Sequence, residues 1–161
     1  MGLDIFFKTR QRDRLIDKMS AKELKDALID TLYVLGQADK WNLDSFYRQM
    51  TDKLGQAENE EGYLRKANYV YAYFKGRIDE GCECEVTRDD LIDLIKRCCE
   101  VLGKRDNATS KATLPTCNGF FFGSTDYDDV YYETVKFGLE LFTKLLNNYD
   151  DTKVLYVWFC Y

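Results

Sequence analysis

The sequence predicts an α+β protein, mainly helical, in which about five helices accompany a small two- or three-stranded sheet that joins the N- and C-terminal strands. Apolar residues recur at helical spacing through most of the chain. The last segment, 153–161 (KVLYVWFCY), is β-branched, aromatic and almost continuously apolar, and the opening LDIFFK at 3–8 offers it a partner strand. A length of 161 residues suits one domain with its own core, so a single domain over 1–161 is expected.

Five segments combine helical spacing with start or stop signals. Ser20 and Glu23 form a capping box, and Gly36 supplies the stop for the first helix. Thr87 is expected to cap the fourth helix, with Asp90 three residues later, and Gly103 is expected to end it. The predicted helices are 20–35, 44–54, 61–80, the segment between Thr87 and Gly103, and 128–148.

The remaining segments are predicted to be extended or irregular. Residues 83–86 read as a short extended piece, and 104–111 read as a polar loop. Residues 114–129 (LPTCNGFFFGSTDYDD) contain the only proline and a turn-forming Asn118-Gly119 pair, which exclude a continuous helix. The three phenylalanines at 120–122 are predicted to form a buried strand. The residues that follow are of helix N-cap type: Ser124, Thr125 and Asp126.

The amino-acid composition indicates which kinds of partner and which cellular compartment to expect. A net charge of −5 argues against nonspecific nucleic-acid binding, and no stretch approaches the roughly 20 apolar residues of a membrane span. No signal peptide is recognised, so a cytoplasmic location with reduced cysteines is expected. The chain has no histidine and no C-x-x-C spacing, which disfavours a metal site, and no cofactor is expected. The cysteines are Cys82, Cys84, Cys98, Cys99, Cys117 and Cys160.

Catalytic patterns are also lacking. Without histidine there is no Ser-His or Cys-His pair, and no phosphate-binding or nucleophile-elbow motif occurs. Neighbouring acids such as Asp128 and Asp129 point in different directions on a helix and are typical of a solvated first turn. A non-catalytic binding protein that acts through protein–protein contact is therefore the first hypothesis, and an enzyme is the third.

The second hypothesis is a small-ligand pocket, of nucleotide-like type, between the predicted 61–80 helix and the 120–126 turn. A helix N-terminus with hydroxyls and aromatic rings nearby can bind a small ligand, with Arg65 supplying charge. The structural alternative, a buried Phe strand and a well-capped helix with nothing bound, is favoured. Tyrosines here can likewise be interface anchors or the edge of a core. The candidate residues are Arg65, Asn68, Tyr69, Thr116, Asn118, Ser124, Thr125, Asp126 and Tyr127.

Three motifs carry a resemblance to a known family: MGLDIFF at 1–7, YLRKAN at 63–68 and LPTCNGFFFGSTDYDD at 114–129. Together they resemble a family of small proteins of phages, prophages and gut-bacterial mobile elements, with no match over 10–60. The family has no established activity, so the resemblance transfers no catalytic residue. It implies an accessory protein in the cytoplasm of a bacterial host, with a host protein as partner. Such a protein would inhibit a host defence protein or sequester a nucleotide.

Overall fold

The computed structural model describes residues 2–11, 26, 59–119 and 121–161, and the chain divides into two compact units. One unit is Met1–Thr9 with Glu60–Tyr161, and the other is Arg10–Asn59. Apart from Asp26, which is helical, the helices predicted at 20–35 and 44–54 lie outside the described residues. The expectation of one domain over 1–161 stays a prediction.

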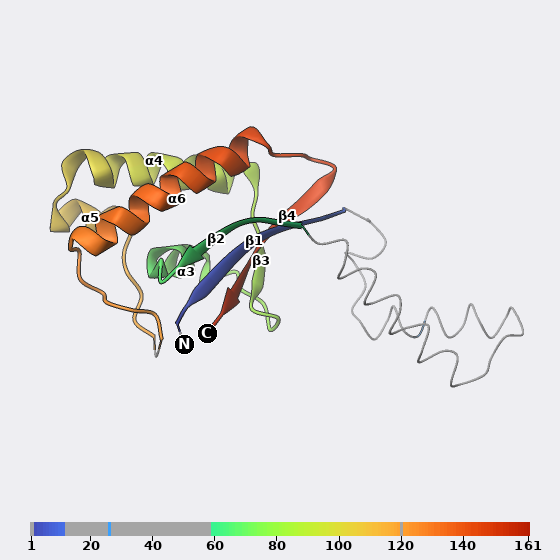
Figure 1. The fold of residues 1–161 in the computed structure, drawn as a ribbon, viewed down its shortest axis with the longest axis horizontal. Helices are drawn as coiled ribbons and strands as arrows, with labels where there is room; N and C mark the ends of the chain where they lie inside the picture. Colours follow the sequence, from blue (N-terminus) through green and yellow to red (C-terminus); the bar gives the residue numbers. More distant parts are fainter. Residues whose placement is uncertain (1, 12–25, 27–58, 120) are drawn as a thin grey trace, which may run out of the picture. The chain divides into compact units, whose positions relative to one another are not determined.

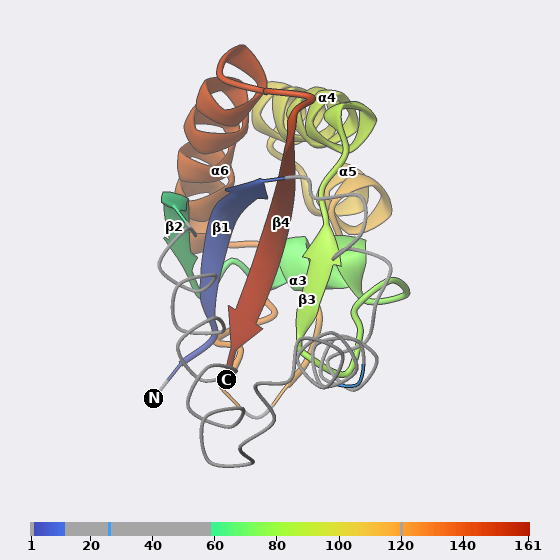
Figure 2. The same cartoon turned by 90° about the vertical axis from the view of Figure 1, so that its right-hand side faces the viewer.

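The first unit is built on a four-stranded antiparallel sheet with the order β2-β1-β4-β3 (Figure 2). The chain's first and last strands are neighbours in this sheet, which confirms that the two ends pair. The sheet has one strand more than the two or three predicted. Its strands are β1 (Asp4–Gln11), β2 (Asn59–Arg65), β3 (Glu83–Glu85) and β4 (Lys153–Cys160).

Four helices are present in the described part of the chain, and they cover one face of the sheet (Figures 1 and 2). Thr87 caps α4 and exchanges hydrogen bonds with Asp90, as predicted, and Asp128 caps α6 by accepting from the Tyr131 N–H at 3.0 Å. The helices are α3 (Asn68–Phe74), α4 (Arg88–Lys104), α5 (Asn107–Thr113) and α6 (Asp129–Asn147).

The core lies between the sheet and these helices. At the end of β4, Val157 and Phe159 are buried while Trp158 between them is half-buried, in agreement with the alternation of side chains along a strand. Across the interface the Phe7 and Phe142 rings meet edge to face, 5.8 Å between centroids. Each large side chain buried this way contributes roughly 1.5–3 kcal/mol, so the sheet and helices stabilise each other.

The predicted helix at 61–80 is wrong in its first half. The chain is extended through Arg65, turns at Lys66 with a φ of 55°, and is helical only from Asn68 to Phe74. The apolar residues that suggested one helical stripe belong to two elements. Leu64 is a buried residue of β2, and Phe74 is a buried residue of α3.

Three further boundaries differ from the predictions. The segment at 104–111 is not a loop, because Asp106 caps α5 by accepting from the Thr109 N–H at 2.8 Å. Helix α4 continues through Gly103 and ends at Arg105, which is left-handed. The prediction of a strand at 120–122 is wrong for Phe121 and Phe122, which lie in a turn. In this turn the Phe122 N–H donates to the Gly119 carbonyl at 3.2 Å. Residue 120 lies outside the described residues. Turn geometry prevails there because Gly119 and Gly123 flank the aromatics.

Candidate functional site

Asn68 holds the 121–126 segment in place. Its side chain is buried, and Nδ2 donates to the carbonyl of Ser124 at 2.9 Å and to that of Phe122 at 3.4 Å. The Leu3 N–H donates to the Phe121 carbonyl at 3.0 Å, which ties the same segment to the N-terminus. The structure therefore brings Asn68 and Ser124 together, and the Asn68 amide connects the start of α3 to the loop through these two hydrogen bonds.

The other polar residues of this loop bond mainly to one another. Thr116 Oγ1 donates to the Thr125 carbonyl at 2.9 Å, and the Thr116 N–H donates to Tyr127 Oη at 3.3 Å. Ser124 Oγ donates to Asp126 Oδ2 at 3.1 Å and accepts from the Asp126 N–H at 3.0 Å. A ligand would have to replace these bonds.

Among the remaining candidates of this region, Asn118 is exposed and Tyr69 belongs to the core. Tyr69 Oη donates to the Thr134 carbonyl at 3.0 Å, and burial holds the pKa of the phenol well above its usual value. Its ring packs on Tyr131, whose phenol donates to the Leu114 carbonyl at 2.8 Å. The small-ligand pocket stays a prediction.

Arg65 belongs to β2, whereas Asn68 belongs to α3. The turn at Lys66 separates it from Asn68, so the two are not on one helix as predicted. Arg65 Nε is 3.8 Å from Asp4 Oδ1 on β1, and the exposed Arg65 side chain lines a groove between β2 and α6. The candidate residues thus divide between the loop and this groove.

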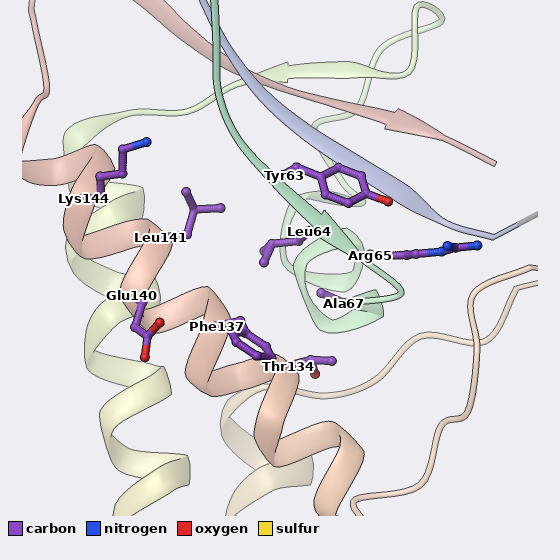
Figure 3. Close-up of a pocket in the computed structure, with 9 residues that line it drawn as sticks. All are labelled: Tyr63, Leu64, Arg65, Ala67, Thr134, Phe137, Glu140, Leu141 and Lys144. Atoms are coloured by element: carbon purple, nitrogen blue, oxygen red, sulfur yellow. The ribbon is translucent and has the colours of Figure 1, made fainter.

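The groove lies between β2 and α6 and has a volume of about 540 Å³ (Figure 3). Leu64 and Ala67 are buried on the strand side, and Leu141 of α6 faces them. Two large aromatic side chains remain open to solvent beside it: Tyr63 is 44% exposed and Phe137 58% exposed. The lining residues are Tyr63, Leu64, Arg65, Ala67, Thr134, Phe137, Glu140, Leu141 and Lys144.

Gly62 explains why strand and helix approach so closely. A Cβ built at this position overlaps the Leu141 side chain, so a larger residue here would require that side chain to move. The groove is apolar along its floor and carries both signs of charge at its border, from Arg65, Glu140 and Lys144. Such a combination suits a peptide or protein surface better than a single small anion.

Strand β2 is an edge of the described sheet, and its outer side carries backbone groups. The Lys66 N–H donates to the Leu3 carbonyl at 2.8 Å, so the Arg65 C=O of the same peptide plane is directed away from β1. Four residues earlier, the Glu61 C=O accepts from Lys144 Nζ of α6 at 3.0 Å. Lys144 therefore occupies one acceptor on the outer side of the strand.

On the sheet face opposite the helices, three rings form a row across the strands. The Phe6 centroid is 5.1 Å from that of Tyr63 and 5.5 Å from that of Trp158, and Lys8 Nζ lies 4.9 Å from the Trp158 centroid. Tyr63 Oη donates to Asp4 Oδ1, a bond that raises the pKa of the phenol together with a smaller effect of burial. These contacts hold the Tyr63 ring in position beside the groove.

Cys98 is a free thiol buried in the core. Burial raises the pKa of the Cys98 thiol to about 12, so it is not a nucleophile at neutral pH. No group of three His, Cys, Asp or Glu side chains in the described ranges is placed to hold a metal ion. Similarly, no described helix has the length and apolar character needed to cross a membrane.

Sequence reasoning missed most of the groove. Phe137 lies off the apolar stripe of the last helix, and an apolar residue on the polar side of a helix was the available signal. Tyr63 and Gly62 were placed in a helix, so their position at a sheet edge was hidden. No sequence pattern predicts that Lys144 lines the groove, because its contact with Glu61 spans 83 positions of the chain.

Comparison with protein-family models, with curated proteins and with solved structures found no match. The geometry of the loop and of the groove is therefore the basis for assigning a function.

Proposed function

We propose that this chain is a non-catalytic binding protein that contacts a partner protein through the groove between β2 and α6. The observation that carries the proposal is the pair of exposed aromatic residues, Tyr63 and Phe137, that line an apolar groove at the β2 edge of the sheet formed by the described residues. Aromatic residues with a polar border are typical of the energetic centre of protein interfaces.

The edge suggests how a partner would bind. An extended segment can add to an exposed strand through main-chain hydrogen bonds while its alternate side chains enter a neighbouring groove. Here β2 supplies the edge and α6 the opposite wall, with Leu141 and Phe137 facing the strand (Figure 3). This arrangement supports recognition of an extended protein segment.

The proposed partner is a host protein, and the proposed action is inhibition of a host defence protein in the bacterial cytoplasm. This part of the proposal comes from the resemblance to phage and mobile-element proteins. The net charge of −5 is compatible with a partner that carries a basic surface.

The test is affinity purification from host lysate, followed by measurement of the dissociation constant with the purified partner. Phe137→Ser should weaken binding at least tenfold, because it removes an exposed aromatic anchor. Val130→Ser is the matched control, since Val130 is 65% exposed on the same helix but does not line the groove. One dominant partner with about micromolar affinity or better is expected. Failure to recover any partner at several salt concentrations, or equal binding by the Phe137→Ser variant, would contradict the proposal.

The nucleotide-like alternative draws its support from the contact between Asn68 and the Ser124 carbonyl, which joins two of the predicted ligand residues. It is the weaker proposal because the loop's polar groups already bond to each other. Thermal-shift measurements with nucleotides in large excess would test it, since a ligand at 100 times its dissociation constant stabilises by about 2.7 kcal/mol. No rise in melting temperature would exclude that ligand class.

A further inference from the structure

Strand β2 carries opposite charges at its two ends. Glu60 and Glu61 stand near its beginning and Arg65 at its end, Lys66 follows as the turn residue after the strand, and Tyr63 lies midway between the acidic and the basic pair. An antiparallel pairing of two such strands about Tyr63 sets the acidic end of each against the basic end of the other. Opposite charges at cross-strand positions stabilise a pair, and like charges destabilise it.

The backbone has the same symmetry. The outward carbonyl of Arg65 and the carbonyl of Glu61 that accepts from Lys144 lie two residues on either side of Tyr63. In an antiparallel pair centred on Tyr63, residue 61 of one strand stands opposite residue 65 of the other. The outward backbone groups of residues 61 and 65 therefore face each other across the pair.

We infer that a second copy of this chain pairs with β2, antiparallel and about a twofold axis at Tyr63, and that two sheets join into one across the axis. The inference rests on the proposed function, because it uses the same β2 edge. It states that a second copy of the chain occupies this edge when no other partner is bound. The twofold symmetry makes a closed dimer, because each edge is used once. A foreign segment would bind by displacing the second copy.

A second feature favours this occupant over an unrelated segment. Tyr63 is an exposed aromatic residue at the proposed axis, and the pairing sets it opposite its own counterpart. Lys144 opposes the pairing, because its bond to the Glu61 carbonyl must be exchanged for one from the second copy. A lysine across an open edge is a known guard against uncontrolled strand addition, so this contact limits the affinity of the dimer.

The decisive experiment uses two charge-reversed variants of the full chain, E60K/E61K and R65E/K66E, studied by analytical ultracentrifugation over a concentration series. The wild type is expected to form a dimer. Each variant alone should dimerise at least tenfold more weakly, because like charges then face each other. An equimolar mixture should restore dimerisation as a heterodimer, since each altered end meets an oppositely altered one. Restoration on mixing also demonstrates that both variants are folded.

The control is K96E/K111E, whose exposed sites lie on α4 and α5 and which carries the same net charge as R65E/K66E. It should dimerise like the wild type and should not behave like R65E/K66E when mixed with E60K/E61K. In a second measurement Lys144→Met should tighten the wild-type dimer, because the Glu61 carbonyl is released. An unchanged or weaker dimer in that variant would count against pairing through β2.

The outcomes separate this inference from the proposed function. A wild type that stays monomeric at 100 μM, by order of magnitude the range of weak association, overturns the dimer but leaves a Phe137-dependent host partner intact. A dimer that persists unchanged in both charge variants places the interface elsewhere and also overturns the inference. A charge-dependent dimer without any host partner supports the inference and removes the proposed host-binding function.

Discussion

At the scale of single residues, two buried polar side chains do most to define the local structure. Asn68 directs its amide donors at two loop carbonyls, and Asp90 collects hydrogen bonds from three side chains and one backbone N–H. Neither faces open solvent, since both are buried. The folded state loses stability when buried polar groups of this kind lose their hydrogen-bond partners. A substitution at each of the two residues therefore has a predictable effect.

Asn68→Asp should destabilise the protein by about 2–3 kcal/mol, because the new carboxylate faces the carbonyls of Phe122 and Ser124 instead of donating to them. An acid at the start of a helix is normally favourable, so a loss would identify the loop contact as the cause. Urea unfolding measures the change. The control, Asn118→Asp in the same loop region, is exposed and should change stability by less than about 0.5 kcal/mol.

Asp90 joins the start of α4 to the end of the preceding α3 region. Arg77 donates to both carboxylate oxygens, at 2.7 and 3.1 Å, and the Thr87 N–H and hydroxyl each donate at 2.8 Å. Burial by itself would raise the pKa of Asp90, but the hydrogen bonds from Arg77 and Thr87 outweigh it and hold the pKa below its usual value. The carboxylate therefore stabilises the folded state in its charged form.

Asp90→Asn should lower stability at neutral pH by about 1–3 kcal/mol, because an amide offers one acceptor oxygen where the carboxylate has two. The group's folded pKa is depressed, so its contribution is present above the unfolded value of about 4 and is lost as the pH falls through the folded pKa. The difference between wild type and variant should thus shrink in acid. Unfolding free energies at several pH values test this, with the exposed Asp89→Asn as control. A difference that is constant with pH would contradict the assignment.

At the scale of elements, two glycines inside helices predict opposite effects of the same substitution. A Cβ at Gly138 of α6 would overlap the Tyr69 hydroxyl and lie 3.2 Å from Phe142 Cε2, whereas a Cβ at Gly103 of α4 meets no atom within 4 Å. Gly138→Ala should cost about 1–3 kcal/mol through overpacking. Gly103→Ala should stabilise by about 0.5–1 kcal/mol through helix propensity. Thermal unfolding measures the change in stability of both variants. Changes of the same sign would contradict the packing of α6 on Tyr69.

Elements with strong local signals could be predicted from the sequence. The Thr87–Asp90 capping box locates the start of α4, and the apolar run at 153–160 locates β4. Strand β2 could not be predicted in this way, because its residues fit a helical stripe and it is extended through pairing with β1, more than fifty positions away. Helix α5 was missed because it is short and polar, so its cap at Asp106 was its main signal.

The same distinction applies to the candidate site. The proximity of Asn68 and Ser124 belongs to the hypothesis of a small-ligand pocket, and the 2.9 Å bond from Asn68 Nδ2 to the Ser124 carbonyl is consistent with that part of it. The separation of Arg65 from Asn68 follows from the positive φ of Lys66, and a lysine gives little indication of that conformation. The groove requires β2 to lie beside α6, a tertiary arrangement that no local pattern specifies.

At the scale of the whole unit, the C-terminal strand lies in the middle of the sheet. β4 is between β1 and β3, and Glu83, Cys84 and Glu85 of β3 pair with Trp158, Val157 and Tyr156. Two further backbone bonds extend this pairing: the Val86 N–H donates to Leu155 at 2.8 Å, and the Phe159 N–H donates to Cys82 at 2.9 Å. β4 thus joins β1 to β3, two strands that are far apart in the sequence, within one sheet.

Truncation after Asp151 should therefore give insoluble or unfolded protein. It removes Leu155, Val157 and Phe159 from the core and separates β1 from β3. Buried side chains of this size contribute roughly 1.5–3 kcal/mol each, and their sum is comparable with the 5–15 kcal/mol of a typical domain. Deletion of Tyr161 alone is the control, because this residue is 54% exposed and follows the strand. Soluble yield and circular-dichroism melting compare the two, and a soluble truncated protein that melts cooperatively would show that β4 is dispensable.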